Sequence, residues 1–222
     1  MIDLHALNVV VHVAAGVVAL IVGVVPLVAR KGGIPHRRFG RVFVGVGAVV
    51  LIAAAFGDVF YGAPPALVGA TIAAGYGYLS GLRALALRAH GPTGTDAALA
   101  VAGIVGCAFL LVFMGPGTAS WTPAIGYSTV GYVATLAVYD LSRFAWSRAW
   151  LAHARPLDHG LKMTGAYFGM MSAGFGNLFP DAQPWSQVGP TGVGFLAMAI
   201  LAAVFVTGHR RSHRERVPLS RA

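Results

Sequence analysis

Three polar residues near the N-terminus are spaced so that they share one face of a helix. His5, Asn8 and His12 follow one another at intervals of three and four residues. At a rise of about 1.5 Å per residue, His12 lies roughly 12 Å below the start of the helix. An imidazole at this depth could bind haem or chlorophyll, carry a proton, or donate a hydrogen bond to a quinone. The alternative is an interhelical hydrogen bond to a partner such as Asp58 or Asn177.

A second group of residues lies where apolar stretches begin. His36 precedes Arg41, and His159 precedes Met163 by four residues, so the last two share a helical face. Imidazoles near a membrane surface can ligate a metal or haem or relay protons, and arginines can hold a phosphate or a carboxylate. Basic residues are also expected at that surface on topological grounds alone. The candidate cofactor-binding residues are therefore His12, His36, Arg41, His159 and Met163.

A few further polar residues stand near the ends of apolar stretches. Asp58 and Asn177 could line a polar cavity with His12, or they could be solvated helix ends. Asp140 is followed three residues later by Arg143, a spacing that favours an ion pair on one helical face. A coupling carboxylate in a transporter is the alternative role for Asp140. The candidate polar-cavity residues are Asn8, Asp58, Asn177 and Asp140.

The composition identifies the environment in which these residues must work. Of the 222 residues, 57% are hydrophobic and only 10% are charged, and the mean hydropathy is +0.72. Soluble domains carry about 25% charged residues. A soluble enzyme, a disordered chain and a nucleic-acid-binding domain are therefore disfavoured despite the net charge of +9. The chain is predicted to be an integral membrane protein whose first partner is the lipid bilayer.

Seven apolar runs are long enough to position these side chains across a membrane, since a helix needs about 20 residues to cross roughly 30 Å of hydrocarbon. The runs are Leu4–Val28, Val42–Tyr61, Ala66–Leu87, Ala97–Met114, Ala124–Trp146, Leu161–Phe179 and Val188–Gly208. They predict an all-α, polytopic bundle of seven transmembrane helices over residues 1–208, with three helical hairpins plus one helix as a candidate repeat. Residues 209–222 are predicted to form a basic cytoplasmic tail.

The charges orient this bundle. In a seven-span arrangement all 16 Lys and Arg residues fall on one side, whereas Asp3, Asp58 and Asp181 fall on the other. The positive-inside rule then predicts an outside N-terminus and a cytoplasmic C-terminus. The basic loops are expected to attract anionic lipids. A homo-oligomer and membership of a larger membrane complex both stay open.

The sequence lacks the motifs of several well-known kinds of catalytic and binding site. The sequence contains no phosphate-binding P-loop, no GxSxG nucleophile motif and no HExxH zinc motif. The apolar runs contain no acidic pair of the kind that binds metals, so no metal site is predicted. Lys31 and Lys162 are interpreted as interfacial, which excludes a lysine-bound retinal. The single cysteine, Cys107, excludes an internal disulfide.

Two stretches of the chain resemble bacterial membrane proteins grouped as domain of unknown function 2306. The first runs from His12 through Lys31-Gly32 to His36-Arg37-Arg38-Phe39-Gly40-Arg41-Val42-Phe43, and the second from His159 through Met163 and Tyr167 to Asn177. Ala166 stands where serine is common in the family. The resemblance implies a multi-span protein of a bacterial cytoplasmic membrane and supplies no reaction. It highlights His12, His36, Arg41, His159, Met163 and Asn177.

Three functions follow from these patterns. The first is a membrane protein that binds haem or a quinone through its histidines. The second is a small-solute or proton-coupled transporter, with Asp58, Asp140 and the histidines along its pathway. The third is a non-catalytic accessory subunit of a membrane complex.

Overall fold

The computed structural model describes residues 3–87, 91–115, 117 and 121–216, with side chains as far as residue 208. All regular structure in these ranges is helical. Seven of the described helices have 20 residues or more: α1 (Leu4–Val28), α2 (Ile34–Tyr61), α3 (Pro65–Ala86), α4 (Gly94–Phe113), α5 (Pro123–Ser142), α7 (Arg155–Leu178) and α8 (Trp185–Arg216). Shorter segments are α6 (Ser147–Ala149), a π-helical turn η1 (Trp150–Ala154) and a 3₁₀ turn η2 (Pro180–Ala182). The predicted all-α bundle is confirmed.

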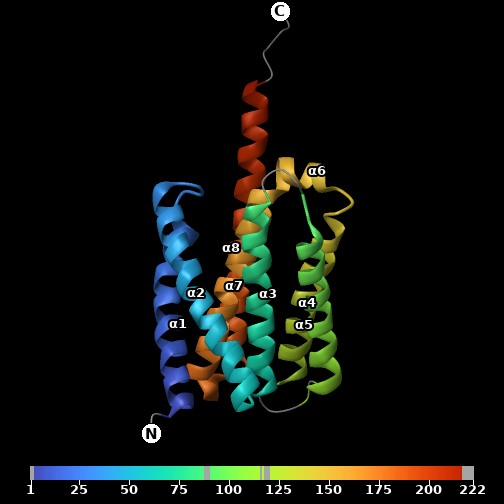
Figure 1. The fold of residues 1–222 in the computed structure, drawn as a ribbon. Coiled ribbons are helices and arrows are strands. Elements are labelled where there is room, and N and C mark those ends of the chain that lie inside the picture. Colours follow the sequence, from blue (N-terminus) through green and yellow to red (C-terminus); the bar gives the residue numbers. More distant parts are fainter. Residues whose placement is uncertain (1–2, 88–90, 116, 118–120, 217–222) are drawn as a thin grey trace, which may run out of the picture.

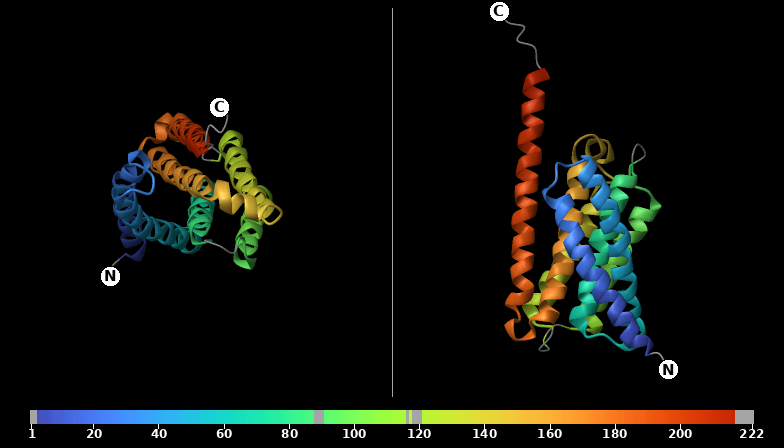
Figure 2. Two further views of the ribbon diagram at one scale, coloured as in Figure 1. Left: turned by 90° about the horizontal axis from the view of Figure 1, so that it is seen from above. Right: turned by 90° about the vertical axis from the view of Figure 1, so that its left-hand side faces the viewer.

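The long helices run up and down beside one another (Figure 1). The C-terminal ends of α1, α3 and α5 lie at the same end of the bundle as α6, and α8 extends beyond the other helices at this end (Figure 2). We call this the basic end, because it holds described basic residues such as Lys31, Arg83 and Arg143. The N-terminus lies at the opposite end.

Two helices begin earlier than the apolar runs predict. α2 begins at Ile34 rather than at Val42, and α7 begins at Arg155 rather than at Leu161. Each has a proline in its first turn, Pro35 and Pro156, where the missing N–H costs no helical hydrogen bond. The polar stretches around His36 and His159 are therefore helical, and not loops.

The C-terminal ends of α5 and α8 also differ from the prediction. α5 ends at Ser142, four residues before Trp146, whereas α8 continues past Gly208 to Arg216. The predicted tail at 209–222 thus begins as helix, and residues 217–222 lie outside the described part of the chain.

The two larger of three apolar cores divide the bundle into halves. One core joins α1, α2 and α7 through residues such as Ala19, Phe43 and Tyr167. The other joins α3, α4 and α5 through residues such as Ala100 and Val133. The halves meet where α3 packs against α7, in the middle of the bundle (Figure 2).

Four of the described helices are long and apolar enough to cross a membrane, which indicates a multi-pass membrane protein. They are α1, α2, α4 and the Trp185–Gly208 part of α8. Their large apolar side chains are widely exposed, as at Ile21, Ile52 and Leu196. By contrast, α3 and α7 bury the most residues. The less apolar helices are therefore the central ones, where polar groups can be satisfied by neighbouring helices.

Glycine allows the two central helices to approach each other. An added Cβ at Gly81 of α3 would lie 3.0 Å from the sulfur of Met163 and 3.1 Å from Cβ of Lys162. On α7, an added Cβ at Gly165 would collide with the hydroxyl of Tyr132. These glycines thus belong to a packing seam inside the chain.

Candidate functional site

The polar face of α1 is turned toward α2. Asn8 Nδ2 donates to the carbonyl of Ala53 at 3.1 Å, and His12 Nδ1 lies 3.1 Å from the carbonyl oxygen of Val50. Both side chains are half-buried. Asp58 lies close enough to His12 for the imidazole to act on its carboxylate. The structure therefore brings Asn8, His12 and Asp58 to one region, and the first two bind backbone carbonyls of α2.

Asn177, the remaining residue of the predicted outer cavity, does not join this group through a hydrogen bond in the described structure. Its side chain is exposed, and Nδ2 donates to the carbonyl of Ala173 in its own helix at 2.8 Å. This placement corresponds to the solvated helix end that the sequence left open as an alternative.

His36 and Arg41 lie at the basic end. His36 Nδ1 is 3.0 Å from the carbonyl oxygen of Pro26, which also accepts a hydrogen bond from Lys31 Nζ at 2.8 Å. These contacts satisfy a carbonyl of the last turn of α1 that has no partner within the helix. Arg41 is exposed and donates from Nε to the carbonyl of Arg37 at 3.3 Å.

His159 and Met163 line the seam between α7 and α3. His159 Nδ1 lies 2.9 Å from the carbonyl oxygen of Gly81, and Met163 packs beside the same glycine. His36 is close enough to act electrostatically on His159. The structure therefore brings these two predicted residues into one neighbourhood at the basic end.

One type of contact recurs at these positions. A polar side chain reaches a main-chain carbonyl of another helix at His12, His36 and His159, and the hydroxyls of Tyr78 and Tyr167 do the same toward Val44 and Leu20. Each bond adds a second partner to a carbonyl or caps a helix end. In the three histidines, a proton on Nδ1 would leave Nε2 as the acceptor nitrogen.

The most unusual site in the described structure surrounds Asp140. The predicted ion pair with Arg143 is present, with Nη2 3.0 Å from Oδ1. It is only part of a larger group, because Lys162 also pairs with Asp140, and Asp158 pairs with both cations. We call Asp140, Arg143, Asp158 and Lys162 the charge cluster.

The charge cluster links the end of α5 to the first turns of α7. Asp158 Oδ2 lies 3.1 Å from Arg143 Nη1, and Asp158 Oδ1 lies 2.9 Å from Lys162 Nζ. The four side chains are 1–3% exposed. Two cations and two anions therefore balance within a space that water does not reach, which makes the ion pairs stronger and an unpaired charge more costly.

Aromatic residues complete the charge cluster. The hydroxyl of Tyr76, in α3, donates to Asp140 Oδ2 at 2.8 Å, and Trp150 Nε1 donates to Asp158 Oδ2 at 3.1 Å. The Arg143 guanidinium stands 4.8 Å from the centre of the Trp150 ring. Trp150 is fully buried in the π-helical turn, so η1 covers the cluster at the basic end. Side chains from α3, α5, η1 and α7 thus meet at one site.

The sequence missed most of this site. Lys162, which the sequence places at an interface, is buried inside the bundle, because the earlier start of α7 adds the turn that carries Asp158 four residues before it. The two aspartates also form an acidic pair that no single apolar run contains. A signal was nevertheless present: Asp140 and Arg143 are spaced by three and Asp158 and Lys162 by four, on opposite sides of one short connection.

A second ion pair at the basic end differs in its exposure. Arg83 at the end of α3 binds Asp96 at 2.8 Å, and the Arg83 side chain is 31% exposed. Asp96 also accepts from the backbone N–H and the hydroxyl of Thr93, which makes it part of a capping box at the start of α4. This pair is explained by helix capping alone.

Two hollows lie on the described surface. One lies between α1 and α2 and has a volume of about 440 Å³. The other, of about 460 Å³, lies on α5 beside Val138 and Tyr139. Neither is lined by a histidine, so neither provides a site of the predicted cofactor-binding kind.

No protein-family model, no curated protein and no solved structure matches the chain. The resemblance to the domain of unknown function 2306 therefore stays a prediction that rests on the motifs around His36 and His159.

Proposed function

We propose that the chain is a multi-pass protein of a bacterial cytoplasmic membrane in which all seven long helices cross the bilayer. The helices α3, α5 and α7 are less apolar than the four candidate spans, but they contain 22, 20 and 24 residues, which is near the required length of about 20. Their polar side chains bind one another in the middle of the bundle. By the positive-inside rule, the basic end faces the cytoplasm and the N-terminus lies outside.

We further propose that the protein is a proton-coupled transporter of a small solute, and that the charge cluster closes its cytoplasmic end. The observation that carries this proposal is the complete burial of Asp140, Arg143, Asp158 and Lys162 between α5 and α7. Ionisable groups inside membrane bundles are costly and commonly belong to ion or proton pathways. The cluster also stands where the two halves of the bundle meet, and rocking of one half against the other is a common transport motion.

The contacts of Asp140 supply a mechanism for coupling. Its carboxylate accepts from Tyr76 and pairs with Lys162 and Arg143. A proton on Asp140 removes one of the two negative charges that hold Lys162, the one that α5 supplies, so the link between α5 and α7 weakens. Loss of the proton restores the ion pairs and closes the cytoplasmic end again.

The seam beside the cluster provides a place for a pathway. Tyr132 of α5 directs its hydroxyl toward Gly77 and Gly165, on α3 and α7, and this buried oxygen has no hydrogen-bond partner in the described structure. A buried polar atom without a partner requires an explanation, such as a water molecule or a transient ligand. In the conformation described here, the two halves are in contact around it.

The proposal is tested by the accessibility of Tyr132 from the cytoplasmic side. Cys107→Ala removes the only cysteine, and Tyr132→Cys then places a reporter in the seam. The matched control is Val133→Cys, the neighbouring residue of α5, which is fully buried in the α3–α4–α5 core. Inside-out vesicles are treated with a membrane-impermeant maleimide, with and without Lys162→Met.

We expect Tyr132→Cys to react faster than Val133→Cys. Lys162→Met should accelerate labelling at position 132 at least about tenfold, because removing one partner of a buried ion pair costs about 3–5 kcal/mol. Labelling at position 133 should not change. Equal labelling at the two positions, or equal acceleration of both, would show that the cluster holds the fold together and closes no pathway.

The second candidate function is binding of haem or a quinone, which is favoured by the placement of His36 and His159 at the basic end. Both present Nδ1 to a backbone carbonyl, an arrangement that orients histidine ligands in many metal sites and leaves Nε2 for the ligand. An absorption spectrum of detergent-extracted protein tests this candidate. A Soret band that His159→Ala abolishes would support it, whereas a spectrum without the band, and an extract without quinone, would remove it.

A further inference from the structure

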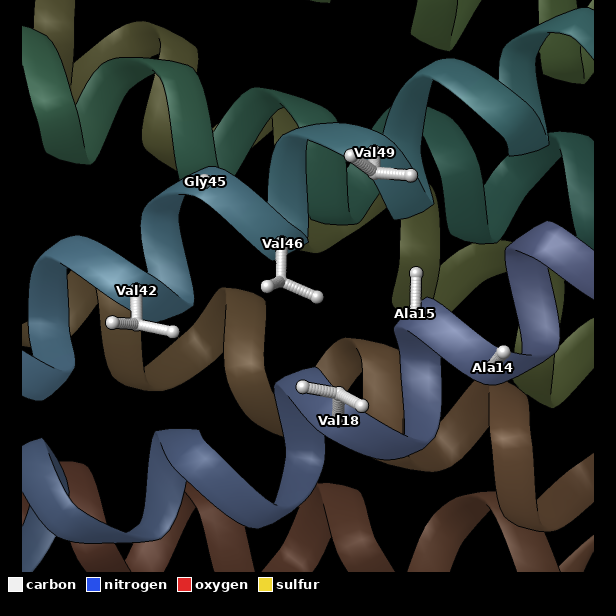
Figure 3. A pocket seen from close by; sticks show the side chains of 7 residues that line it. All are labelled: Ala14, Ala15, Val18, Val42, Gly45, Val46 and Val49. Atoms are coloured by element: carbon white, nitrogen blue, oxygen red, sulfur yellow. The ribbon is translucent and has the colours of Figure 1, made fainter.

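The groove between α1 and α2 is entirely apolar and lies on the outer surface of the bundle. It is lined by three residues of α1 and four of α2: Ala14, Ala15, Val18, Val42, Gly45, Val46 and Val49. Figure 3 shows these short side chains between the two helices, with Val18 and Val46 directed toward each other. A Cβ at Gly45 would have no atom within 4 Å, so no other described part of the chain fills the groove at this point.

A positive charge stands on the same face of α2. Arg38, Val42, Gly45 and Val49 follow at intervals of four, three and four residues, which is the repeat of one helical stripe. Arg41 flanks this stripe, and both arginines are exposed. In the described structure the Arg38 side chain has no hydrogen bond or ion pair. Residues 4–57 contain no acidic residue that could neutralise it.

The distance between the charge and the far end of the groove matches one leaflet of a membrane. From Arg38 to Val49 the helix rises roughly 16 Å at about 1.5 Å per residue. Half of a hydrocarbon core of about 30 Å is nearly the same length. A cation at the membrane surface and an apolar groove that reaches the middle of the bilayer fit one molecule with an anionic headgroup and an acyl chain.

We propose that this face binds an anionic phospholipid of the cytoplasmic leaflet, with its phosphate at Arg38 and Arg41 and an acyl chain in the groove. A guanidinium can hold two phosphate oxygens at once. A second copy of the chain fits this face poorly, because a two-fold dimer would place Arg38 and Arg41 beside the same cations of its partner. The inference rests on the proposed orientation of the bundle and on the crossing of α1 and α2, and not on the charge cluster.

Native mass spectrometry of the full chain in detergent tests the proposal. The probes are phosphatidylglycerol and phosphatidylcholine with identical acyl chains. We expect one phosphatidylglycerol to bind at least about tenfold more tightly than phosphatidylcholine, because each basic residue near a membrane surface adds to the attraction for anionic lipid. Arg38→Gln should remove most of this preference, whereas Arg148→Gln, an exposed arginine of α6, should leave it unchanged.

The groove itself is tested by filling it. Gly45→Leu should weaken the binding of both lipids about tenfold, since its Cβ meets no atom within 4 Å and the longer side chain occupies the groove that Gly45 lines. The control is Gly16→Leu, on the same hairpin. A Cβ at Gly16 also meets no atom within 4 Å, but Gly16 is not one of the residues that line the groove. Equal effects of the two leucines, equal affinity of the wild type for both lipids, or a dimer that Gly45→Leu dissociates would each overturn the lipid site.

Discussion

The α1–α2 hairpin and the junction of α5 with α7 place polar groups inside apolar helices in two different ways. In the hairpin, Asn8 and His12 are half-buried, and each binds one backbone carbonyl of the neighbouring helix. At the junction, Asp140 and Lys162 are fully buried and carry charges that only other side chains can balance. Both arrangements hold helices together, but the stability of the junction depends on each polar partner much more than the stability of the hairpin does.

The difference lies in what remains when one partner is removed. A carbonyl of α2 keeps its own helical hydrogen bond if His12 is lost, so little is left unsatisfied. A carboxylate of the charge cluster keeps its full charge if Lys162 is lost, in a space closed to water. The hairpin therefore tolerates change in its polar residues, and the junction does not.

The largest expected effect is that of Lys162→Met. It leaves Asp140 and Asp158 with Arg143 as their only cationic partner in the described structure, so the cluster has one excess negative charge. We expect the free energy of unfolding to fall by about 3–5 kcal/mol. Thermal unfolding of the purified protein in one detergent, compared with the wild type, measures this loss.

A double variant separates charge balance from packing. Asp140→Asn combined with Lys162→Met leaves the pair of Asp158 with Arg143 and restores neutrality. The double variant should be more stable than Lys162→Met alone, although it carries one more substitution. If the two losses simply add, charge balance is not what stabilises the junction.

A smaller effect is expected where the hairpin meets α7. A Cβ at Gly23 would lie 2.7 Å from the ring of Tyr167 and 2.9 Å from that of Phe43, so Gly23→Ala should cost about 1–3 kcal/mol of unfolding free energy. Gly16→Ala on the same helix meets no atom within 4 Å and should gain up to about 1 kcal/mol from helix propensity. The same thermal unfolding measurement compares the two; equal stability would mean that α1 does not pack on α7 in this way.

The smallest effects are expected for the neutral polar residues. His12→Ala removes one interhelical hydrogen bond and should cost about 0.6 kcal/mol, and at most about 1.7. Asn177→Ala affects an exposed side chain and should change the stability by less than about 0.5 kcal/mol. A loss at His12 as large as that for Lys162→Met would abolish the distinction between the hairpin and the junction.

The prediction of elements from the sequence succeeded where one physical property dominated. Length and apolarity alone predict Leu4–Val28, and α1 has these bounds in the structure. The predicted start of α7 was wrong by six residues, since the helix begins at Arg155 and not at Leu161. The apolar run ends where the first charged residues occur, whereas the helix continues through them. That error also concealed the charge cluster, since it left Asp158 outside the helix that carries Lys162.

The histidines show the same limit. For His12 the sequence left an interhelical hydrogen bond open as one alternative, and in the structure His12, His36 and His159 each contact a carbonyl of another helix. The sequence could not show whether each histidine binds a cofactor or a backbone carbonyl. Every residue has a backbone carbonyl, so this partner cannot be recognised from residue types or their spacing.

The sequence by itself determined that this is a helical protein built for a membrane, since few charges and long apolar runs are properties of composition and order. It also placed the basic residues at every second connection. Only the tertiary structure decided that Asp140, Arg143, Asp158 and Lys162 meet, because that requires α5 and α7 both to pack against α3, so that their basic ends come together beside Trp150 and Tyr76. The reason is that a charged residue in a sequence is expected to be exposed to solvent. Its partners become known only when the contacts between helices that are distant in the sequence are known.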